Sequence, residues 1–215
     1  MTPAAFILAN TILKAPPHVP EFRLHLADEA HDLWLKTEEE RGVIGLPPPF
    51  WAFAWAGGQG LARHLLDHPH LIAGKSVLDF ATGSGIVAIA AALAGAADVT
   101  ACDIDLWACE AARLNASANH VVLDIRKGDL LGARAFEVIL AGDVFYDREL
   151  AASAWPRLQK AAAEGAAVFV GDPGRSYVPK SGLTALATCE VPVLSSLEDA
   201  DVKKTTVWRV DVPSA

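Results

Sequence analysis

Short apolar runs alternate with longer helical patterns along most of the chain. Apolar runs of about four to eight residues, bounded by glycine or polar residues, are typical of buried strands, whereas apolar positions three and four apart indicate a helix. From Trp51 onward the pattern predicts helices at Gly58–Asp67, Ile86–Ala94, Leu106–Ala118 and Arg148–Ala163. It predicts strands at Ser76–Phe80, Asp98–Cys102, Val121–Ile125, Phe136–Ala141 and Ala166–Val170.

Strands that alternate with helices of this length predict an α/β fold. In such a fold a parallel sheet is covered by helices on both faces. The alanine-rich, almost entirely apolar segment Ile86–Ala94 fits this arrangement, because a helix of that kind is pressed against a sheet. Near the end of the chain, Cys189–Val193 and Thr205–Val210 are joined by an acidic segment. We expect these two runs to form an antiparallel hairpin at the sheet edge.

The first part of the chain is less regular. We expect a short helix within Ala4–Leu13 and strands or a hairpin within Arg23–Thr37. Gly42–Pro49 is rich in glycine and proline and predicts a loop. The sequence therefore predicts an N-terminal extension of residues 1–48, followed by a single domain of residues 49–215. The strand prediction rests on the spacing of Leu24, Leu26, Leu33 and Leu35.

The composition limits the classes of partner. The chain has 215 residues, 52% hydrophobic and 20% charged, which is enough for one buried α/β core. The formal net charge is −8, and lysine and arginine do not cluster as they do in general nucleic-acid-binding proteins. We therefore expect a small-molecule or protein substrate and no nucleic acid. No exposed heptad or long apolar edge is evident, so we expect a monomer.

Cysteine, histidine and the N-terminal residues indicate the compartment. Cys102, Cys109 and Cys189 show no paired spacing, which favours reduced thiols in a cytosolic compartment. The seven histidines show no metal-binding spacing, so we predict no metal site. The apolar part of Ala4–Leu13 is too short to span a membrane and lacks the basic residues of a signal peptide or presequence. We expect a cytoplasmic protein without a membrane partner.

The turn after the first strand of the domain carries a binding motif. In a parallel α/β sheet, ligands bind beyond the carboxyl ends of the strands, and glycine lets the main chain approach them closely. Gly83 and Gly85 therefore predict a nucleoside-cofactor site, which methyltransferases and nicotinamide enzymes share. The full motif reads Val77-Leu78-Asp79-Phe80-Ala81-Thr82-Gly83-Ser84-Gly85.

Asp79 favours a cationic cofactor. A carboxylate at this position repels a pyrophosphate but does not repel the sulfonium of S-adenosylmethionine. The dinucleotide fingerprint has glycine where Ala88 stands, although alanine is permitted there. Neither of the two tyrosines begins the Tyr-x-x-x-Lys pair that an NAD-dependent oxidoreductase would use. We favour an S-adenosylmethionine-dependent methyltransferase and keep the NAD-dependent oxidoreductase as the alternative.

Acidic residues after the next strands fit the rest of a nucleoside. Asp103 ends the second strand, where a carboxylate accepts hydrogen bonds from ribose hydroxyls. A helix N-cap is the alternative role for Asp103, and Asp105 is the better candidate for that role. Asp129 is a candidate acceptor for the adenine amino group, with Leu130 covering the ring. A plain turn is the alternative there.

The fourth strand ends in a motif with no obvious packing purpose, Gly142-Asp143-Val144-Phe145-Tyr146-Asp147. Asp143 and Tyr146 are therefore candidates for the methyl-acceptor side of the site. The aromatic run Phe50–Trp55 could form a wall of the site by stacking and cation–π contacts. Ordinary core packing is an equally good explanation for any one of these rings.

These segments resemble the seven-β-strand protein lysine methyltransferases, in particular the members that act on the β-subunit of electron transfer flavoprotein. The resemblance runs from about residue 49 to residue 209. It implies a Rossmann-like, seven-stranded class I methyltransferase sheet, with S-adenosylmethionine as the methyl donor. The segments that carry it are Pro49–Trp55, Gly57–Gln59, Gly74–Asp79, Asp103–Asp105, Gly142–Asp147, Gly171–Arg175 and Thr205–Trp208.

The resemblance also implies a substrate and a set of site residues. It implies lysines of electron transfer flavoprotein β-subunit as methyl acceptors, with a ribosomal protein or a small amine as alternatives. Our hypothesis is that Asp143 stabilises the ammonium that develops during transfer, while Tyr146 orients the nitrogen. Together with the turn residues, the predicted cofactor contacts are Trp55, Asp79, Ala81, Thr82, Gly83, Gly85, Asp103, Ile104, Asp129, Leu130 and Gly142.

Two features set this chain apart from its family. Ala81 stands where relatives commonly have glycine, and one additional methyl group is tolerable there only if the cofactor keeps a small clearance. The animal relatives are mitochondrial, and no presequence is visible here. The resemblance therefore implies a bacterial, cytoplasmic form.

Overall fold

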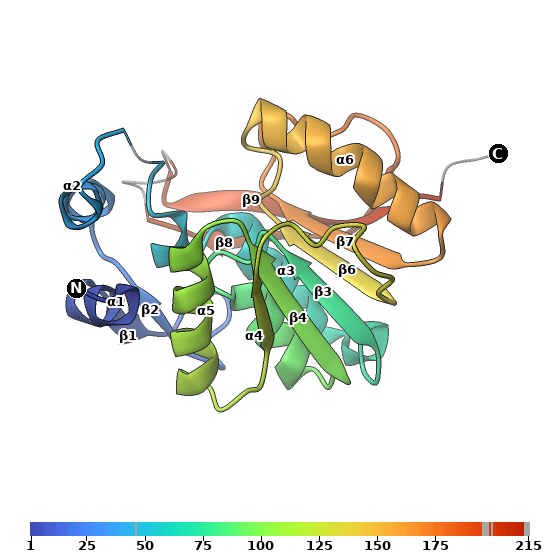
Figure 1. Cartoon of the computed structure of the whole chain (residues 1–215). Coiled ribbons are helices and arrows are strands. Elements are labelled where there is room, and N and C mark those ends of the chain that lie inside the picture. The colour runs from blue at the N-terminus through green and yellow to red at the C-terminus, as the bar shows by residue number, and fades with distance from the viewer. Residues whose placement is uncertain (46, 195–197, 199, 213–215) are drawn as a thin grey trace.

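A seven-stranded sheet forms the centre of the protein (Figure 1). The computed structural model describes residues 1–45, 47–194, 198 and 200–212. The strand order is β5-β4-β3-β6-β7-β9-β8. The first five strands in this order are parallel, and β9 pairs antiparallel with both β7 and β8. The parallel strands are β3 (Ser76–Phe80), β4 (Asp98–Asp103), β5 (Asp124–Lys127), β6 (Val138–Gly142) and β7 (Ala167–Asp172).

Helices cover both faces of the sheet, as predicted (Figure 1). Right-handed crossovers place α4 (Ile86–Leu93) and α5 (Leu106–Ala118) on one face, because both connect strands that progress away from β3 in the same direction. The connection from β6 to β7 runs the other way and places α6 (Arg148–Ala163) on the opposite face. The helix α3 (Ala56–Asp67) joins α4 on the first face.

The two faces of each central strand contribute to different cores. Val77 and Leu140 pack with α3 and α4, whereas their neighbours Leu78 and Ile139 pack with α6. All four side chains are buried, which explains why these strands are continuous apolar runs rather than alternating ones.

The C-terminal hairpin is confirmed, and it is longer than predicted. It consists of β8 (Leu183–Pro192) and β9 (Val202–Val210), which pair from Leu183 with Val210 to Pro192 with Val202. Most side chains of β8 face solvent, including those of its first half, so they give no pattern of buried positions. The edge strand β5 likewise begins three residues later than predicted, at Asp124, because an exposed edge accepts charged side chains.

The N-terminal part combines helices with a small sheet. The strands β1 (Ile12–Lys14) and β2 (Leu24–Leu26) pair antiparallel. The predicted strand structure within Arg23–Thr37 is correct for β2 and wrong beyond it, because the chain forms the helix α2 (Ala30–Arg41). Leu33 is buried and Leu35 is exposed, as on a helix, whereas a strand would place both on one face. The remaining elements are α1 (Pro3–Asn10) and the short 3₁₀ helices η1 (Phe50–Ala52) and η2 (Pro69–Leu71).

The N-terminal elements pack against α5. Phe6 and Trp51 join a buried cluster with Trp107, and the Phe6 and Trp107 ring centroids lie 4.9 Å apart. A domain boundary at residue 48 stays a prediction. None of the described helices is long and apolar enough to cross a membrane. Cys102, Cys109 and Cys189 are all free thiols.

Candidate active site

The site lies where the strand order reverses direction. After β3 the chain continues towards β4, and after β6 it continues towards β7, so a crevice opens beyond the carboxyl ends of β3 and β6. The segments that line this cleft include Trp55, Gly58, the turn Ala81–Ser84 and Gly142–Asp143. The predicted residues Trp55, Asp79, Ala81, Thr82, Gly83, Gly142 and Asp143 are thus brought together.

The buried Asp79 side chain holds the turn after β3 and the start of α4 by hydrogen bonds. Its side chain is 1% exposed, and its Oδ2 accepts hydrogen bonds from Thr82 Oγ1 at 2.5 Å and from the Ala88 backbone N–H at 3.1 Å. Ala88 lies in the first turn of α4, so Asp79 caps that helix in place of Gly85, the N-cap residue, which has no side chain. Burial raises the pKa of Asp79 to about 7.

The turn uses left-handed backbone conformations at three positions. Gly83 and Gly85 have φ of 53° and 82°, which glycine adopts without strain. Gly85 also packs on α5, since a Cβ there would lie 3.1 Å from the Ala112 Cβ. Ala81 has φ of 55°, an unfavourable conformation for a residue with a side chain. Glycine would adopt the same conformation without this strain.

Asp103 links the turn to the end of β4. Its two carboxylate oxygens accept hydrogen bonds from the Gly83 N–H at 3.0 Å and from the Asp105 N–H at 2.9 Å. Burial raises the pKa of Asp103. Asp105 caps α5 by accepting from the Trp107 N–H at 3.0 Å, which confirms Asp105 as the helix N-cap. Each Asp103 oxygen keeps a second lone pair for a ribose hydroxyl, and Ile104 beside it is 75% exposed.

Asp129 and Leu130 lie outside the lining of the cleft in the part of the chain that the structure describes. Asp129 Oδ1 accepts from the Leu131 N–H at 2.9 Å, as in a tight turn. Its Oδ2 forms an ion pair with Arg157 of α6 at 2.7 Å. Their predicted contacts with adenine stay predictions.

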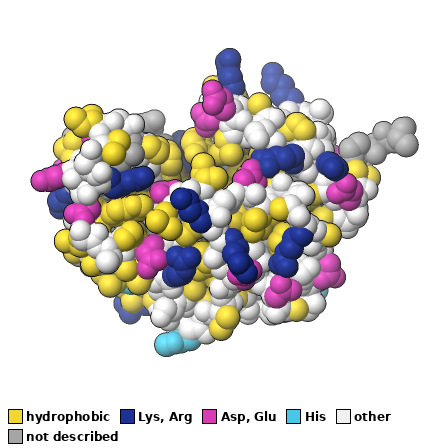
Figure 2. Space-filling view, in the orientation of Figure 1, with side chains coloured by type: hydrophobic (Ala, Val, Ile, Leu, Met, Phe, Trp, Pro, Cys, Tyr) yellow, Lys and Arg dark blue, Asp and Glu magenta, His cyan; other side chains and the backbone are white. Residues whose placement is uncertain are grey.

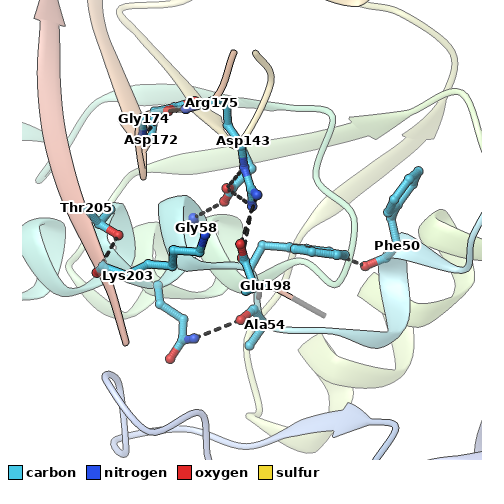
Figure 3. Close-up of polar contacts among 12 residues, drawn as sticks. Phe50, Ala54, Gly58, Asp143, Asp172, Gly174, Arg175, Glu198, Lys203 and Thr205 are labelled. Atoms are coloured by element: carbon cyan, nitrogen blue, oxygen red, sulfur yellow. Dashed lines mark hydrogen bonds and ion pairs between the residues drawn. The ribbon is translucent and has the colours of Figure 1, made fainter. Parts of the chain in front are cut away.

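Asp143 connects three segments at the end of β6 (Figure 3). Its Oδ2 accepts from the Gly58 N–H of α3 at 2.8 Å, and its Oδ1 accepts from Arg175 Nη2 at 2.9 Å. Its own N–H donates to the Gly171 carbonyl oxygen at 2.9 Å, and its φ is 54°. Burial raises the pKa of Asp143 to about 7, although the Arg175 guanidinium acts in the opposite direction.

Glycines let α3 come this close to the sheet. A Cβ on Gly57 would lie 2.3 Å from the Gly171 carbonyl oxygen, and one on Gly142 would lie 3.0 Å from the Gly58 Cα. Only glycine fits at such contacts between main chains. The resulting approach places the Gly58 N–H against Asp143.

The aromatic run divides between site and core. Phe50 lies 5.7 Å from Trp55 and 5.2 Å from Tyr146, measured between ring centroids. Trp55 lines the cleft, and its Nε1 donates to the Phe50 carbonyl oxygen at 2.8 Å. Trp51 instead belongs to the buried cluster around Trp107, so core packing is the correct explanation for that ring.

A second cavity of about 290 Å³ has Tyr146, Arg175 and Lys203 among its lining residues. Tyr146 is 44% exposed, and burial of the rest of its ring raises its pKa. Arg175 also contacts Glu198, which follows β8. Sequence reasoning noted the Gly171–Arg175 segment without giving Arg175 a role. It missed Glu198 and Lys203, which no local pattern distinguishes.

Comparisons with known proteins indicate the family of the chain. The sequence profile of the ribosomal protein L11 methyltransferase (PrmA) family matches residues 64–145. The electron transfer flavoprotein beta subunit lysine methyltransferase of Xenopus laevis is 37% identical over 217 residues, covering 97% of this chain and 87% of that protein.

Two solved structures share the fold. A putative RNA methyltransferase from Pyrococcus horikoshii superposes with a TM-score of 0.58 at 16% identity, over 79% of this chain and 91% of that one. Magnesium protoporphyrin IX methyltransferase from Synechocystis, solved with bound S-adenosylmethionine, superposes with a TM-score of 0.51 at 15% identity, over 72% and 78% of the two chains.

The fold is that of the class I methyltransferases. Within that class, the chain belongs to the electron transfer flavoprotein beta subunit lysine methyltransferase family. This membership excludes the alternative of an NAD-dependent oxidoreductase. Among the described residues no group of three or more His, Cys, Asp or Glu side chains could hold a metal ion.

Proposed function

We propose that this protein transfers methyl groups from S-adenosylmethionine to lysine side chains of electron transfer flavoprotein β-subunit. The observation that carries the proposal is the match over 97% of the chain to a relative named for that activity. The match to the L11 methyltransferase profile covers only residues 64–145, the cofactor half of the fold, and therefore favours no ribosomal substrate.

The residues around the cleft fit the cofactor. The Gly83 backbone at the turn leaves open space on its Cβ side, and the Asp103 carboxylate lies directly beside it. Trp55 and Asp79 line the same cleft and would lie near the sulfonium end, where an aromatic face and a carboxylate both favour positive charge. When bound, the cofactor supplies an electrophilic methyl group.

The acceptor lysine must be neutral when it reacts. An ordinary lysine has a pKa of about 10.4, so only about one in 2,500 is neutral at pH 7. The proton leaves to water or to a nearby group, and the site must then hold the nitrogen lone pair in line with the methyl group. We propose that the Asp143 carboxylate on the cleft wall stabilises the positive charge that develops on nitrogen, while Tyr146 orients the amine.

Exposed apolar side chains support a protein acceptor rather than a small amine. Figure 2 shows apolar side chains gathered over the N-terminal elements, while both signs of charge are mixed over the rest of that face. Ile44, which precedes the aromatic run, is 94% exposed, and Ile104 and Leu106, between the end of β4 and the start of α5, are also exposed. Exposed apolar groups of this kind favour contact with a folded partner.

Incubation of the purified protein with methyl-labelled cofactor and a cell extract tests the substrate. We expect the main labelled band to be electron transfer flavoprotein β-subunit, with the label on lysine. Purified ribosomal protein L11, a small amine and total RNA serve as parallel acceptors. Label in L11 or RNA, with none in the flavoprotein subunit, would contradict the proposal.

We further infer that the protein is a cytoplasmic monomer that binds neither nucleic acid nor membranes. The net charge of −8 and the free thiols support this inference. Light scattering should give the mass of one chain, and cell fractionation should place the protein with soluble cytoplasmic markers. A dimer mass or a membrane pellet would contradict it.

A further inference from the structure

The segment Gly142–Asp147 at the end of β6 is called the acceptor motif below. Its Asp143 belongs to a buried network of alternating charges (Figure 3). The Arg175 guanidinium lies between two carboxylates. It donates to Asp143 Oδ1 from Nη2 at 2.9 Å and from Nε at 3.3 Å. It donates to the two oxygens of Glu198 from Nη1 and Nη2, each at 2.9 Å. The side chains of Arg175, Asp143 and Glu198 are only 20%, 10% and 2% exposed.

The main chain and an aromatic ring also fix Arg175 in place. Asp172 Oδ1 accepts from the backbone N–H groups of Gly174 and Arg175, both at 2.7 Å, and so shapes the loop after β7. The guanidinium carbon lies 5.6 Å from the centroid of the Trp55 ring, which lines the cofactor cleft. Arg175 therefore touches both the acceptor motif and the cofactor cleft.

Stability is a poor explanation for this arrangement. Burying a guanidinium between two carboxylates removes three charges from water, and apolar replacements of buried ion networks are often neutral or stabilising. The network does, however, join the ends of β6 and β7 to Glu198 at a single guanidinium. Its geometry instead controls where the Asp143 carboxylate points and whether that carboxylate is ionised.

We propose that Arg175 and Glu198 are positioning residues for methyl transfer: Glu198 holds the Arg175 guanidinium, and Arg175 holds the Asp143 carboxylate towards the acceptor nitrogen. The proposal rests on the proposed function, in which Asp143 acts on the developing ammonium. In this proposal Arg175 and Glu198 act through Asp143 and not directly on the reacting nitrogen or the methyl group.

The charges around Asp143 set the direction of the expected effect. Arg175 lowers the pKa of Asp143, while burial and the nearby Asp172 carboxylate raise it. The helix α3 presents the uncharged Gly58 N–H, and Glu198 lies on the far side of Arg175. Removing the Arg175 charge therefore raises the pKa of Asp143 further, so that Asp143 becomes neutral at pH 7. Removing the Glu198 charge does not raise it.

The test compares Arg175→Gln, Arg175→Lys and Glu198→Gln with Arg113→Gln, which removes an exposed arginine that pairs with Glu110 on α5. The first measurement is the pH profile of kcat with electron transfer flavoprotein β-subunit as substrate. The second is the affinity for S-adenosylhomocysteine. The third is the NMR titration of the Asp143 carboxyl carbon, which needs no substrate.

For Arg175→Gln we expect the acid limb of kcat and the Asp143 titration to move up by about one pH unit or more, which lowers kcat at pH 7 by about fivefold or more. Arg175→Lys keeps the charge but not the forked geometry, so it should recover part of kcat. Glu198→Gln should lower kcat without moving the limb upward. Arg113→Gln should match the wild type, and all variants should keep their affinity for S-adenosylhomocysteine.

Two results would overturn the positioning roles. One is a uniform loss of kcat at every pH in Arg175→Gln, with the acid limb unmoved, which indicates a structural role. The other is an Asp143 titration that does not respond to Arg175→Gln. If Arg175→Gln does not fold, Arg175→Lys and Glu198→Gln carry the test. If the wild type does not methylate the flavoprotein subunit, the proposed function fails, and the titration still decides the positioning roles.

Discussion

Two aspartates at neighbouring strand ends have the same structural role in this enzyme. Asp79 is the last but one residue of β3 and accepts from the N–H of Ala88 in the first turn of α4. Asp143 follows β6 and accepts from the N–H of Gly58 in the first turn of α3. A carboxylate at a helix N-terminus is stabilised by the partial positive charge there. The cofactor cleft is thus bounded by two helix N-termini, each held by a buried aspartate.

The burial of Asp79 predicts a pH dependence of stability. Its pKa is about 7 in the folded protein, compared with an ordinary value near 3.8. The proton is therefore bound more tightly in the folded state. The corresponding stability is complete below about pH 4 and is lost as the pH rises through about 7, at most on the order of 4 kcal/mol.

Asp79→Asn should remove this contribution, because asparagine has no charge and can still accept from Thr82 and Ala88. Urea unfolding from pH 4 to pH 8 should show a shallower fall in the free energy of unfolding than in the wild type. Asp98→Asn, at the exposed start of β4, is the control and should keep the wild-type slope. Equal slopes in all three proteins would rule out a raised Asp79 pKa.

The backbone conformation of Ala81 predicts that its replacement by glycine stabilises the folded protein. Its left-handed conformation costs about 1–2 kcal/mol, whereas glycine adds about 0.4–1 kcal/mol of entropy to the unfolded chain. Ala81→Gly should therefore change the free energy of unfolding by between about zero and 1.6 kcal/mol in the stabilising direction. Ala92→Gly in α4 should instead destabilise by about 1 kcal/mol. Chemical denaturation of both variants checks this, and a clear loss of stability in Ala81→Gly would contradict it.

At the scale of elements, the placement of α3 determines the position of one wall of the cofactor cleft. Its first turn meets the ends of β6 and β7 through Gly57 and Gly58, with main-chain atoms of Gly171 on the other side. No side chain can be inserted at Gly57 without moving the helix. Because Trp55 and the Gly58 N–H belong to this helix start, its position also sets one wall of the cleft.

A pair of alanine substitutions tests this contact. Both Gly57→Ala and Gly58→Ala gain about 1 kcal/mol of helix propensity. A Cβ at Gly57 would lie 2.3 Å from a carbonyl oxygen, whereas at Gly58 the nearest atom is the end of the Ile86 side chain at 3.0 Å. Gly57→Ala should therefore be the less stable by about 1–3 kcal/mol. Thermal unfolding of the two proteins measures the difference, and equal stability would contradict the close contact.

The sequence predicted correctly those helices whose starts are marked by a capping residue and whose apolar residues face the core. The helices at Leu106–Ala118 and Arg148–Ala163 begin after Asp105 and Asp147, each of which caps its helix. The pattern failed at α2, where an apolar residue faces solvent, and at the first half of β8, which has few buried side chains.

The same limit applies to the site. Asp103 and the glycine turn are recognisable because strand ends and glycines mark them in sequence. Glu198 is separated from Arg175 by 23 residues and is placed only by tertiary contacts, so no spacing could reveal it. The internal hydrogen bonds of Asp79 and Asp143 were equally invisible to sequence reasoning.

At the scale of the molecule, the N-terminal elements and the sheet domain share buried clusters. Leu24 and Leu26 join the core beneath α3 and α4, and Phe6 packs against Trp107 of α5. Parts that share buried surface in this way unfold together in small proteins.

Phe6→Ala should therefore lower the stability of the whole protein by about 3–5 kcal/mol, with a single transition. Far-UV circular dichroism and tryptophan fluorescence should give coincident curves, since Trp51 and Trp107 report the N-terminal contact. Leu8→Ala, on the exposed side of α1, should change little. Two separate transitions would show that the N-terminal part unfolds independently.

The most direct test of the central claim is the intact mass of purified electron transfer flavoprotein β-subunit after incubation with S-adenosylmethionine and this enzyme. The wild type should increase the mass by whole methyl groups, and fragmentation should place them on lysine. Asp143→Asn should bind the cofactor and leave the mass unchanged. An unmodified subunit in the presence of cofactor-bound wild-type enzyme would contradict the account.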